Sequence, residues 1–418
     1  MVDRLYYTDS FLAGFRASVT DVREVSRTGG QSVWQLALDR TAFYPTSGGQ
    51  PYDTGSLLAA SRSGTTIEVA VLDVQEDERG EIWHYTEKPL AAGTEVQASI
   101  DWVRRMDHMQ QHSGQHLLSA VFATEMQAMT VSFHLGEEIS TIDLACDGVT
   151  PADLERMERR ANELIAEDRL ISADTVDRLE AEAMMAVGRL RKLPERAGGM
   201  RLIEIADYDL NACGGTHLSS TGQIGGMLLR SIEKARQGVR IEFACGQRAV
   251  RTARMDYGLL AKASAPLSIG PAELPQAVVR MQAEAKASAK ERQKLREELA
   301  GYHAASLIGE DAVQDGLRVV QRKYADRDPI YCKLLASLVA AAAAQTVALI
   351  ASTQQEPATV VMSSSKGVAF SCSDLLRAEL SKLGLRGGGS PDMAQGQIPR
   401  QQLDVLLADL AAAARAGK

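Results

Sequence analysis

His112-Ser113-Gly114-Gln115-His116 and Cys213-Gly214-Gly215-Thr216-His217 are the two stretches around which the rest of this sequence is organised. Residues four apart on a helix share a face, so a helix through the first stretch presents two imidazoles to one ion. The second stretch adds a thiolate and a third imidazole, which completes a tetrahedral set suited to zinc. Three of the seven histidines fall in these stretches, which disfavours the alternative of ordinary core histidines. We therefore expect one Zn²⁺ per chain, and its expected ligands are His112, His116, Cys213 and His217.

The composition is that of a folded globular protein. Hydrophobic residues make up 45% and charged residues 24% of the 418 residues, which excludes a disordered or fibrous chain. At about 150 residues per domain, the length predicts two or three domains. The 46 basic and 54 acidic residues give a formal net charge of −8, which argues against nucleic-acid binding through the field of the whole surface. Any nucleic-acid site is therefore expected to be a local basic patch.

Neither a membrane segment nor a disulfide framework is expected. The longest largely apolar run, residues 334–344, is too short to span a bilayer, and the N-terminus lacks the pattern of a signal peptide. We therefore expect a soluble, cytoplasmic protein with no membrane partner. The five cysteines are odd in number and scattered, and a chain of this size needs no disulfide staples. Buried thiols and a metal ligand account for them better.

The order of strand and helix patterns predicts a multidomain α+β fold. Short strands between glycine turns predict an N-terminal β-barrel in residues 1–100. Helical periodicity and a hairpin predict a zinc-containing α+β domain in residues 101–255, followed by a long helix as a linker in residues 256–310. Alternating strands and helices predict a C-terminal α/β domain in residues 311–418. Within the first two domains, the expected strands include 33–38, 67–71, 96–100, 202–205, 227–232 and 239–243, with helices at 106–127 and 151–167 and the hairpin at 130–145.

Apolar or small residues recur in heptad spacing along the long helix. Arg292 interrupts this seam, and several of its members are weak. The pattern favours a helix packed on its own neighbours, while a homodimer through this helix or through the C-terminal domain stays an open alternative. The heptad positions are Val278, Met281, Ala285, Ser288, Leu295, Leu299 and Tyr302.

Local basic and glycine-rich segments are the candidates for contact with nucleic acid. Two clusters of arginine and lysine lie in the α+β domain, although an ordinary solvated surface explains either cluster alone. In the C-terminal domain, a lysine and a glycine run offer charge and backbone amides to phosphate, and a flexible loop without a ligand is the alternative. The candidate RNA-binding residues are Arg189, Arg191, Lys192, Arg230, Lys234, Arg236, Arg240, Lys366, Gly387, Gly388 and Gly389.

Four motifs together resemble the editing half of alanyl-tRNA synthetase. The first is residues 41–55, TAFYPTSGGQPYDTG, and the next two are the metal motifs, the second followed by residues 221–225, TGQIG. The fourth, residues 387–396, GGGSPDMAQG, resembles the loop of that enzyme's C-terminal tRNA-binding domain. Because no room for a charging domain precedes Thr41, the resemblance is to the free-standing alanyl-tRNA editing proteins in their long form.

This resemblance implies hydrolysis of mischarged aminoacyl-tRNA in trans, chiefly seryl-tRNA(Ala), with zinc as the cofactor and tRNA as the partner. It makes His112, His116 and Thr130 the candidate catalytic residues. Whether glycyl-tRNA(Ala) is also hydrolysed stays open, as does the choice between water activation and substrate positioning for the zinc. Two other functions stay possible as alternatives: a non-catalytic, zinc-stabilised tRNA-binding protein and an enzyme that edits seryl-tRNA(Thr).

An editing site for serine should hydrogen-bond the serine hydroxyl, because alanine then leaves a buried polar group unpaired. Thr130 and Ser132 are candidates, and the family's threonine on this strand favours Thr130, although strand packing explains a β-branched residue equally well. By resemblance, residues 47–50 lie at the pocket edge, with a simple turn as the alternative. Asn211 either orients a ligand or forms a turn. The expected substrate-binding residues are Thr130, Ser132, Ser47, Gly48, Gly49, Gln50 and Asn211.

Overall fold

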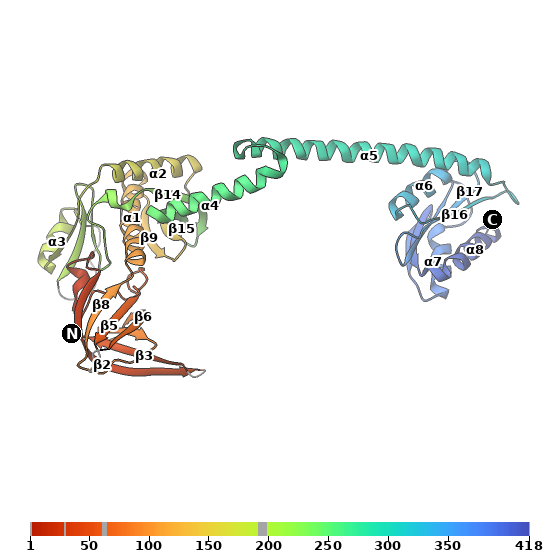
Figure 1. The fold of residues 1–418 in the computed structure, drawn as a ribbon. Helices are drawn as coiled ribbons and strands as arrows, with labels where there is room; N and C mark the ends of the chain where they lie inside the picture. The colour runs from red at the N-terminus through yellow and green to blue at the C-terminus, as the bar shows by residue number, and fades with distance from the viewer. Residues whose placement is uncertain (1, 29–30, 61–64, 191–198, 418) are drawn as a thin grey trace. The chain divides into compact units, whose positions relative to one another are not determined.

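The structure divides into two compact units, Met1–Pro271 and Ala272–Lys418. Both mix helices and strands, which confirms a multidomain α+β fold (Figure 1). In the part of the chain that the structure describes, no helix is both long and apolar enough to cross a membrane. This computed structural model describes residues 2–28, 31–60, 65–190 and 199–417.

A closed six-stranded barrel forms the first part of the N-terminal unit and confirms the predicted barrel (Figure 1). Its strands alternate exposed and buried side chains, as expected where one face lines a barrel interior. In β8 (Glu95–Ile100), Val96, Ala98 and Ile100 belong to the barrel core and the residues between them are exposed. In order around the barrel, the strands are β2 (Gly14–Thr28), β3 (Gln31–Leu38), β7 (Ile82–Thr86), β6 (Thr66–Glu76), β5 (Gly55–Ala60) and β8.

A long buried helix, α1 (Trp102–Met126), follows the barrel directly. Asp101 caps its first turn by accepting a hydrogen bond from the backbone N–H of Arg104. Every residue from Gln111 to Phe122 is buried, so this stretch has no solvent face and must be enclosed by other elements. It packs against β9 (Met129–Leu135) and α2 (Pro151–Ala166), and Thr150 caps the first turn of α2.

Two antiparallel sheets belong to the same unit, and α1 packs against strands of the first of them. One is four-stranded, and it contains the predicted hairpin at 130–145 as neighbouring strands. The other is three-stranded and carries the loop with the second metal motif. The strands of the four-stranded sheet are, in spatial order, β14 (Met227–Ala235), β15 (Gly238–Cys245), β10 (Ser140–Ala145) and β9. Those of the three-stranded sheet are β11 (Ile171–Val176), β12 (Met200–Ile205) and β13 (Asp209–Ala212). Two further helices of the unit are α3 (Arg178–Ala186) and α4 (Gly246–Ser264).

A buried ion pair joins the barrel to α1. The side chains of Arg105 on α1 and Asp53 beside the barrel are both fully buried. The Arg105 Nε lies 3.1 Å from each carboxylate oxygen of Asp53, and its guanidinium also donates to the carbonyl of Ser10. Asp53 in turn accepts a hydrogen bond from the backbone N–H of Tyr44. Both charges are thus fully engaged, as burial requires.

The second unit is built on a five-stranded sheet in the order β16-β17-β18-β20-β19. The glycine run expected as a loop forms an edge strand instead, in which Gly387 pairs with Gly396 and Gly389 with Ala394. Glycine has a low strand propensity, so this segment carries no strand signal in the sequence. Backbone pairing with β20 stabilises the strand instead. The other elements are β16 (Arg318–Tyr324), α6 (Pro329–Ala342), β17 (Thr346–Ser352), β18 (Ala358–Ser364), α7 (Cys372–Lys382), β19 (Gly387–Ser390), β20 (Met393–Ile398) and α8 (Arg400–Ala416).

The long helix, α5 (Leu274–Glu310), belongs to this second unit. It packs through Ala300, Ala304 and Leu307 in a core cluster shared with α6, not through the predicted heptad seam. Small alanines allow this close approach, whereas the larger seam residues Leu295 and Leu299 are exposed. The helix therefore packs on a neighbouring helix as expected, although through residues outside the predicted seam, and a homodimer stays a prediction.

Candidate metal centre

The first two candidate ligands, His112 and His116, lie one turn apart on α1. Both side chains are almost fully buried. Gly114 between them explains how the helix comes so close to the sheet, because a Cβ at this position would lie 2.3 Å from the Sγ of Cys245 on β15. The predicted helical face is present, and the glycine brings it against the sheet.

The other two candidate ligands, Cys213 and His217, come from the loop that follows β13. Gly215 lets this loop reach the helix, because a Cβ there would lie 2.1 Å from Cε1 of His112. Arg201 on β12 holds the same turn by donating to the carbonyls of Cys213 (3.0 Å) and Gly215 (2.8 Å). Arg201 was not among the predicted site residues, because its position outside both motifs carries no signal of this contact.

The four side chains meet as a single group whose ligand atoms all lie within 4.8 Å of one another. The Sγ of Cys213 is 3.4 Å from Nε2 of His112 and 3.4 Å from Nε2 of His217. A tetrahedral zinc with ordinary bond lengths separates a nitrogen and a sulfur ligand by about 3.6 Å. The residues therefore fit the expected ion in donor type, number and spacing.

Neighbouring polar groups orient the imidazoles. Nδ1 of His112 lies 2.7 Å from the carbonyl oxygen of the Gln50 amide, and Nδ1 of His217 lies 3.2 Å from the hydroxyl of Ser113. With a proton on each Nδ1, both Nε2 atoms are left to face Cys213, which is the arrangement a metal requires.

Burial keeps the imidazoles neutral and disfavours a bare thiolate. It lowers the pKa of His112 and of His217 well below the usual value, so both rings are uncharged near neutral pH. It raises the pKa of the Cys213 thiol, against a smaller opposite effect of the Gly215 N–H and the Arg201 charge. A bound cation would reverse this preference by stabilising the thiolate, which is a further sign that the donor set suits a metal.

Gln50 was predicted at the edge of the pocket, but its side chain lies in the protein interior. Its side chain is fully buried, and its amide donates to Oγ1 of Thr216 (2.8 Å) while accepting from the N–H of Thr216 and from His112. Gln50 therefore joins the barrel loop to both metal motifs. Its amide is committed to protein partners, so the expected substrate contact by this side chain is corrected.

We expect Gln50→Leu to weaken zinc binding by about 10-fold to 100-fold, because the substitution removes the acceptor that orients His112. Competition with a chromophoric chelator measures the change directly. Gln35→Leu is the matched control, since Gln35 is a barrel glutamine bonded to Tyr85. Equal zinc affinities for the two variants would contradict the orienting role of Gln50.

The rest of the predicted pocket-edge segment is a tight turn between the barrel and β9. Ser47 and Gln50 exchange two backbone hydrogen bonds, and Gly48 and Gly49 both have positive φ, as this turn requires. A Cβ at Gly49 would lie 2.6 Å from the ring of Phe133 on β9. Ser47 and Gly48 line a cavity, whereas Gly49 packs against Phe133. One part of the segment therefore lies at the cavity, and the other packs against β9.

Thr130 on β9 faces the end of the metal-binding face of α1. Its hydroxyl donates to the hydroxyl of Ser119 (2.7 Å), which also accepts from the Gln115 amide (2.8 Å). Ser119 lies one turn after His116, so the Thr130 hydroxyl is linked to the helix turn that follows this ligand. The side-chain amide oxygen of Gln115, Oε1, is buried and has no hydrogen-bond partner among the described residues.

Two predicted substrate contacts are not supported by the geometry. The hydroxyl of Ser132 is exposed and donates to Asp143 (2.8 Å), which is itself paired with Arg240. The amide of Asn211 donates to Asp209 in the same strand, so it is bonded within β13 rather than to a metal ligand. In both cases the side chain donates its hydrogen bond to a nearby carboxylate. No sequence pattern connects that carboxylate to the site.

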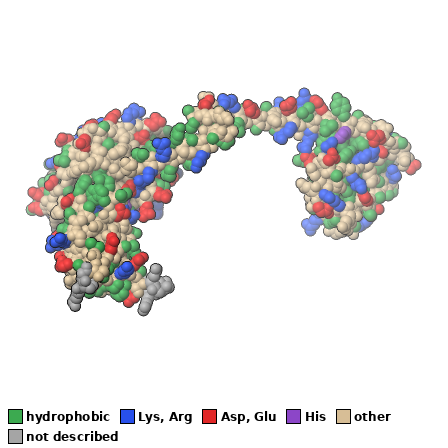
Figure 2. Space-filling model, viewed as in Figure 1, with side chains coloured by type: hydrophobic (Ala, Val, Ile, Leu, Met, Phe, Trp, Pro, Cys, Tyr) green, Lys and Arg blue, Asp and Glu red, His purple; other side chains and the backbone are tan. Residues whose placement is uncertain are grey.

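Three of the predicted RNA-binding arginines form ion pairs with carboxylates. Arg189 pairs with Glu204, Arg230 with Asp256 and Glu242, and Arg240 with Asp143. Figure 2 shows basic and acidic side chains interspersed over the visible face, in keeping with the net charge of −8. Such surface pairs contribute little to stability. Lys234, Arg236 and Lys366 are exposed. Arg191 and Lys192 lie outside the described residues.

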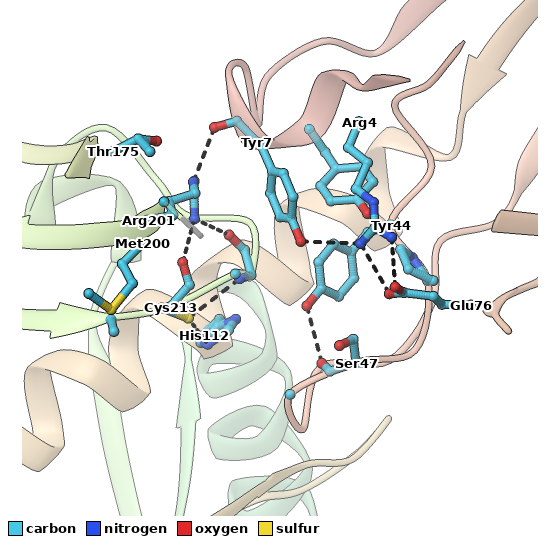
Figure 3. Close-up of a pocket in the computed structure, with 17 residues that line it drawn as sticks. Arg4, Tyr7, Tyr44, Ser47, Glu76, His112, Thr175, Met200, Arg201 and Cys213 are labelled. Carbon is cyan, nitrogen blue, oxygen red and sulfur yellow. Dashed lines mark hydrogen bonds and ion pairs between the residues drawn. The ribbon is translucent and has the colours of Figure 1, made fainter. Parts of the chain in front are cut away.

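A cavity of about 450 Å³ opens beside the metal ligands, between the barrel and the three-stranded sheet (Figure 3). His112 and Cys213 form part of its wall. Tyr7 and Tyr44 line the barrel side, and Arg201 lines the sheet side. This concave space is where a small group could approach the ligand cluster.

Two family models match the chain: "tRNA synthetases class II (A)" at residues 2–104 and "Threonyl and Alanyl tRNA synthetase second additional domain" at residues 200–242. The chain is 30% identical to the alanyl-tRNA editing protein AlaX-L of Pyrococcus horikoshii, over 98% of each chain. It is 36% identical to an alanine–tRNA ligase of Pyrococcus abyssi over 71% of this chain, and it spans 31% of that ligase's length. An alanine–tRNA ligase of Methanoculleus marisnigri is 31% identical over 95% of this chain and 41% of its own length.

Proposed function

This chain belongs to the family of alanyl-tRNA editing proteins, and on that premise we propose that it hydrolyses mischarged tRNA(Ala) in trans, with seryl-tRNA(Ala) as its main substrate. The observation that best supports this proposal is the cluster of His112, His116, Cys213 and His217 at the wall of a cavity. A metal-ligand set beside a small concave space suits the hydrolysis of a small ester.

The proposed reaction meets a physical need of alanine charging. A pocket shaped for alanine cannot strongly reject serine, which only adds a hydroxyl, and such isosteres are typically discriminated by only about 10²-fold. A second site that bonds the hydroxyl rejects alanine instead, because alanine would leave a buried polar group unpaired. Serine would therefore be the amino acid that the editing site removes.

The residues of this chain would hold the reacting groups in place. Gln50 and Ser113 fix the orientation of two imidazoles, and Arg201 fixes the turn that carries Cys213. His112, His116, Cys213 and His217 would hold zinc, and the positive charge of the bound ion would help to position the substrate. Thr130 would accept a hydrogen bond from the serine hydroxyl, since its own proton is donated to Ser119.

We expect Thr130→Val to lower kcat/KM for seryl-tRNA(Ala) by about 10-fold to 100-fold, because valine keeps the shape of threonine but cannot accept a hydrogen bond. Hydrolysis of glycyl-tRNA(Ala), which has no side-chain hydroxyl, should change little in the same variant. Single-turnover deacylation of the two substrates measures the ratio. An equal loss for both would assign Thr130 a packing role instead.

The deciding experiment compares release of serine from tRNA(Ala) and from tRNA(Thr) by the zinc-loaded protein. The proposal expects rapid release from tRNA(Ala) and little from tRNA(Thr). Preferred release from tRNA(Thr) would point to the threonine system, to which one matching family model also refers. Tight tRNA binding with no release from either would indicate a zinc-stabilised tRNA-binding protein.

Contact with tRNA would be confined to local patches. Lys234 and Arg236 lie at the turn between β14 and β15, and both are exposed. Arg189 on the sheet side and Lys366 in the second unit would add further phosphate contacts. Because the net charge of −8 opposes binding overall, affinity for tRNA should be modest and fall steeply with salt.

A further inference from the structure

We propose that a second cavity, at the first turns of α1 and α4, binds a nucleotide through its phosphate group. This cavity has a volume of about 520 Å³ and lies within the N-terminal unit. Among the described residues, none lines both this cavity and the one beside the metal ligands. The inference goes beyond the proposed function, because it assigns a ligand to a place outside the metal centre.

The first turn of α4 borders the cavity and has no cap of its own. Its N-cap residue, Cys245, makes no side-chain capping bond, and the turn contains no acidic residue. Gln247 and Arg248 of this turn line the cavity. The N–H group of Gly246 already donates to the carbonyl of Gly226, so the two N–H groups that follow are the ones available to a ligand. The start of such a helix favours an anion.

His108 on α1 is an independent sign of a ligand. Its side chain lines the cavity and is only 3% exposed, and its Nδ1 has no hydrogen-bond partner among the described residues. Buried polar groups in folded proteins nearly always have a partner. Burial lowers the pKa of His108 to about 4, so the ring is neutral near neutral pH. With its proton on Nδ1, the ring would donate to a phosphate oxygen.

Two arginines in the wall have donors to spare. A guanidinium carries five N–H groups. Arg104 donates to the carbonyl of Tyr52 (3.0 Å) and to Glu137 (3.3 Å). Arg251 is exposed, and its one ion pair among the described residues is a contact of 3.9 Å with Asp107. Both guanidinium groups can therefore turn towards a phosphate, which they would bind by charge-assisted hydrogen bonds.

The carboxylates of the wall are already engaged by protein donors. Arg248 donates to both oxygens of Asp107, and Asp101 accepts the N–H of Arg104 as the cap of α1. Glu137 is 75% exposed and pairs with Arg104, and an exposed pair of this kind costs little to separate. The wall thus offers more free donors than free acceptors, which favours an anion over a cation.

The size and the apolar part of the cavity point to more than a phosphate alone. Its volume lies in the range of roughly 300–1,000 Å³ that is usual for small-molecule sites. Trp102 and Met106, both half-buried, line it together with the exposed Val103. A nucleic-acid base can stack on an indole ring. A phosphate with a nucleoside attached therefore suits the cavity better than inorganic phosphate.

A nucleotide can reach the cavity from two sources, a tRNA strand or a free mononucleotide. Both present the same phosphate to the same donors. His108 lies one helix turn before the candidate metal ligand His112. From either source, the bound nucleotide would thus lie close to the metal-binding stretch of α1.

The test titrates 5′-AMP and adenosine into the zinc-loaded full chain, by calorimetry at low salt. We expect adenosine, which lacks the phosphate, to bind at least about 10-fold more weakly than AMP. Arg251→Gln should weaken AMP binding by about 10-fold, because it removes the charge and keeps most of the side chain. Arg254→Gln is the matched control, since Arg254 is an exposed arginine on the same helix outside the cavity wall.

His108→Phe tests the buried contact, because phenylalanine keeps a ring of similar shape but has no nitrogen. We expect this variant to keep one zinc per chain and to lose AMP affinity without losing adenosine affinity. If AMP binds no more tightly than adenosine, the cavity is not a phosphate site. If Arg251→Gln and Arg254→Gln bind AMP equally well, AMP binds elsewhere and the inference is wrong.

Competition with uncharged tRNA(Ala) then identifies the source of the nucleotide. If tRNA displaces AMP, and Arg251→Gln weakens tRNA binding while Arg254→Gln does not, the cavity takes a nucleotide of the tRNA strand. If AMP stays bound beside tRNA, the ligand is a free nucleotide. Both results support the phosphate site.

The outcomes also separate this inference from the proposed function. A wild-type protein that releases serine from tRNA(Ala) but shows no phosphate-dependent binding of AMP would sink the inference alone. A protein that binds AMP as expected but releases no amino acid from any mischarged tRNA would sink the proposed reaction and leave the nucleotide site standing.

Discussion

His116→Ala is expected to remove the bound zinc and the deacylation activity together. His116 is one of four side chains whose ligand atoms lie within 4.8 Å, and its loss leaves only three donors for a tetrahedral ion. Zinc content should fall from one per chain to near zero after dialysis against a mild chelator, and serine release should fall at least about 10³-fold if the metal positions the ester. Metal analysis and deacylation on the same sample measure both.

His108→Ala is the matched control for this experiment. His108 is also a buried histidine on α1, two turns before His116, but it lies outside the group of ligands. Burial holds its pKa at about 4, so the substitution removes a neutral imidazole. The control should keep its zinc. A zinc-free His116→Ala protein with unchanged serine release would contradict the role of the metal in the reaction.

The sequence predicts the ligands because their signals are local. A spacing of four on a helix and a Cys-to-His loop motif require no knowledge of the rest of the fold. Gln50 shows the limit of this approach: the glycine turn before it was visible, but its contacts join it to His112 and Thr216, far away in the sequence. Arg201 and Ser113 acquire their roles in the same way, through contacts that exist only after folding.

The fold shows the same division between local and distant causes. The signals for the strand at 96–100 and for the helix at 151–167 are local, and the structure contains both elements as β8 and α2. The glycine edge strand β19 depends on its partner β20, so its own residues gave no signal. For α5, heptad spacing marked one face, but small alanines on another face make the contact with α6.

Asp53→Ala is expected to lower the free energy of unfolding of the N-terminal unit by about 3 to 5 kcal/mol, which is the usual cost of leaving one partner of a buried pair unpaired. Arg105 would keep its bonds to the carbonyls of Ser10 and Ala42 but would lose its counter-ion at a fully buried position. Urea denaturation followed by tryptophan fluorescence isolates this unit, because Trp34, Trp83 and Trp102 all lie within it.

Two further variants make this measurement specific to the buried pair. Glu182→Ala breaks the exposed pair with Arg178 on α3, where side-chain exposures are 47% and 57%, and should cost less than about 1 kcal/mol. The double variant Asp53→Ala/Arg105→Met should recover part of the loss, because it removes the uncompensated charge together with its partner. If Asp53→Ala is no more destabilising than Glu182→Ala, the pair does not join the barrel to α1. If the loss is large and the double variant recovers it, the barrel loop that carries Gln50 is held against the metal-binding helix by this pair.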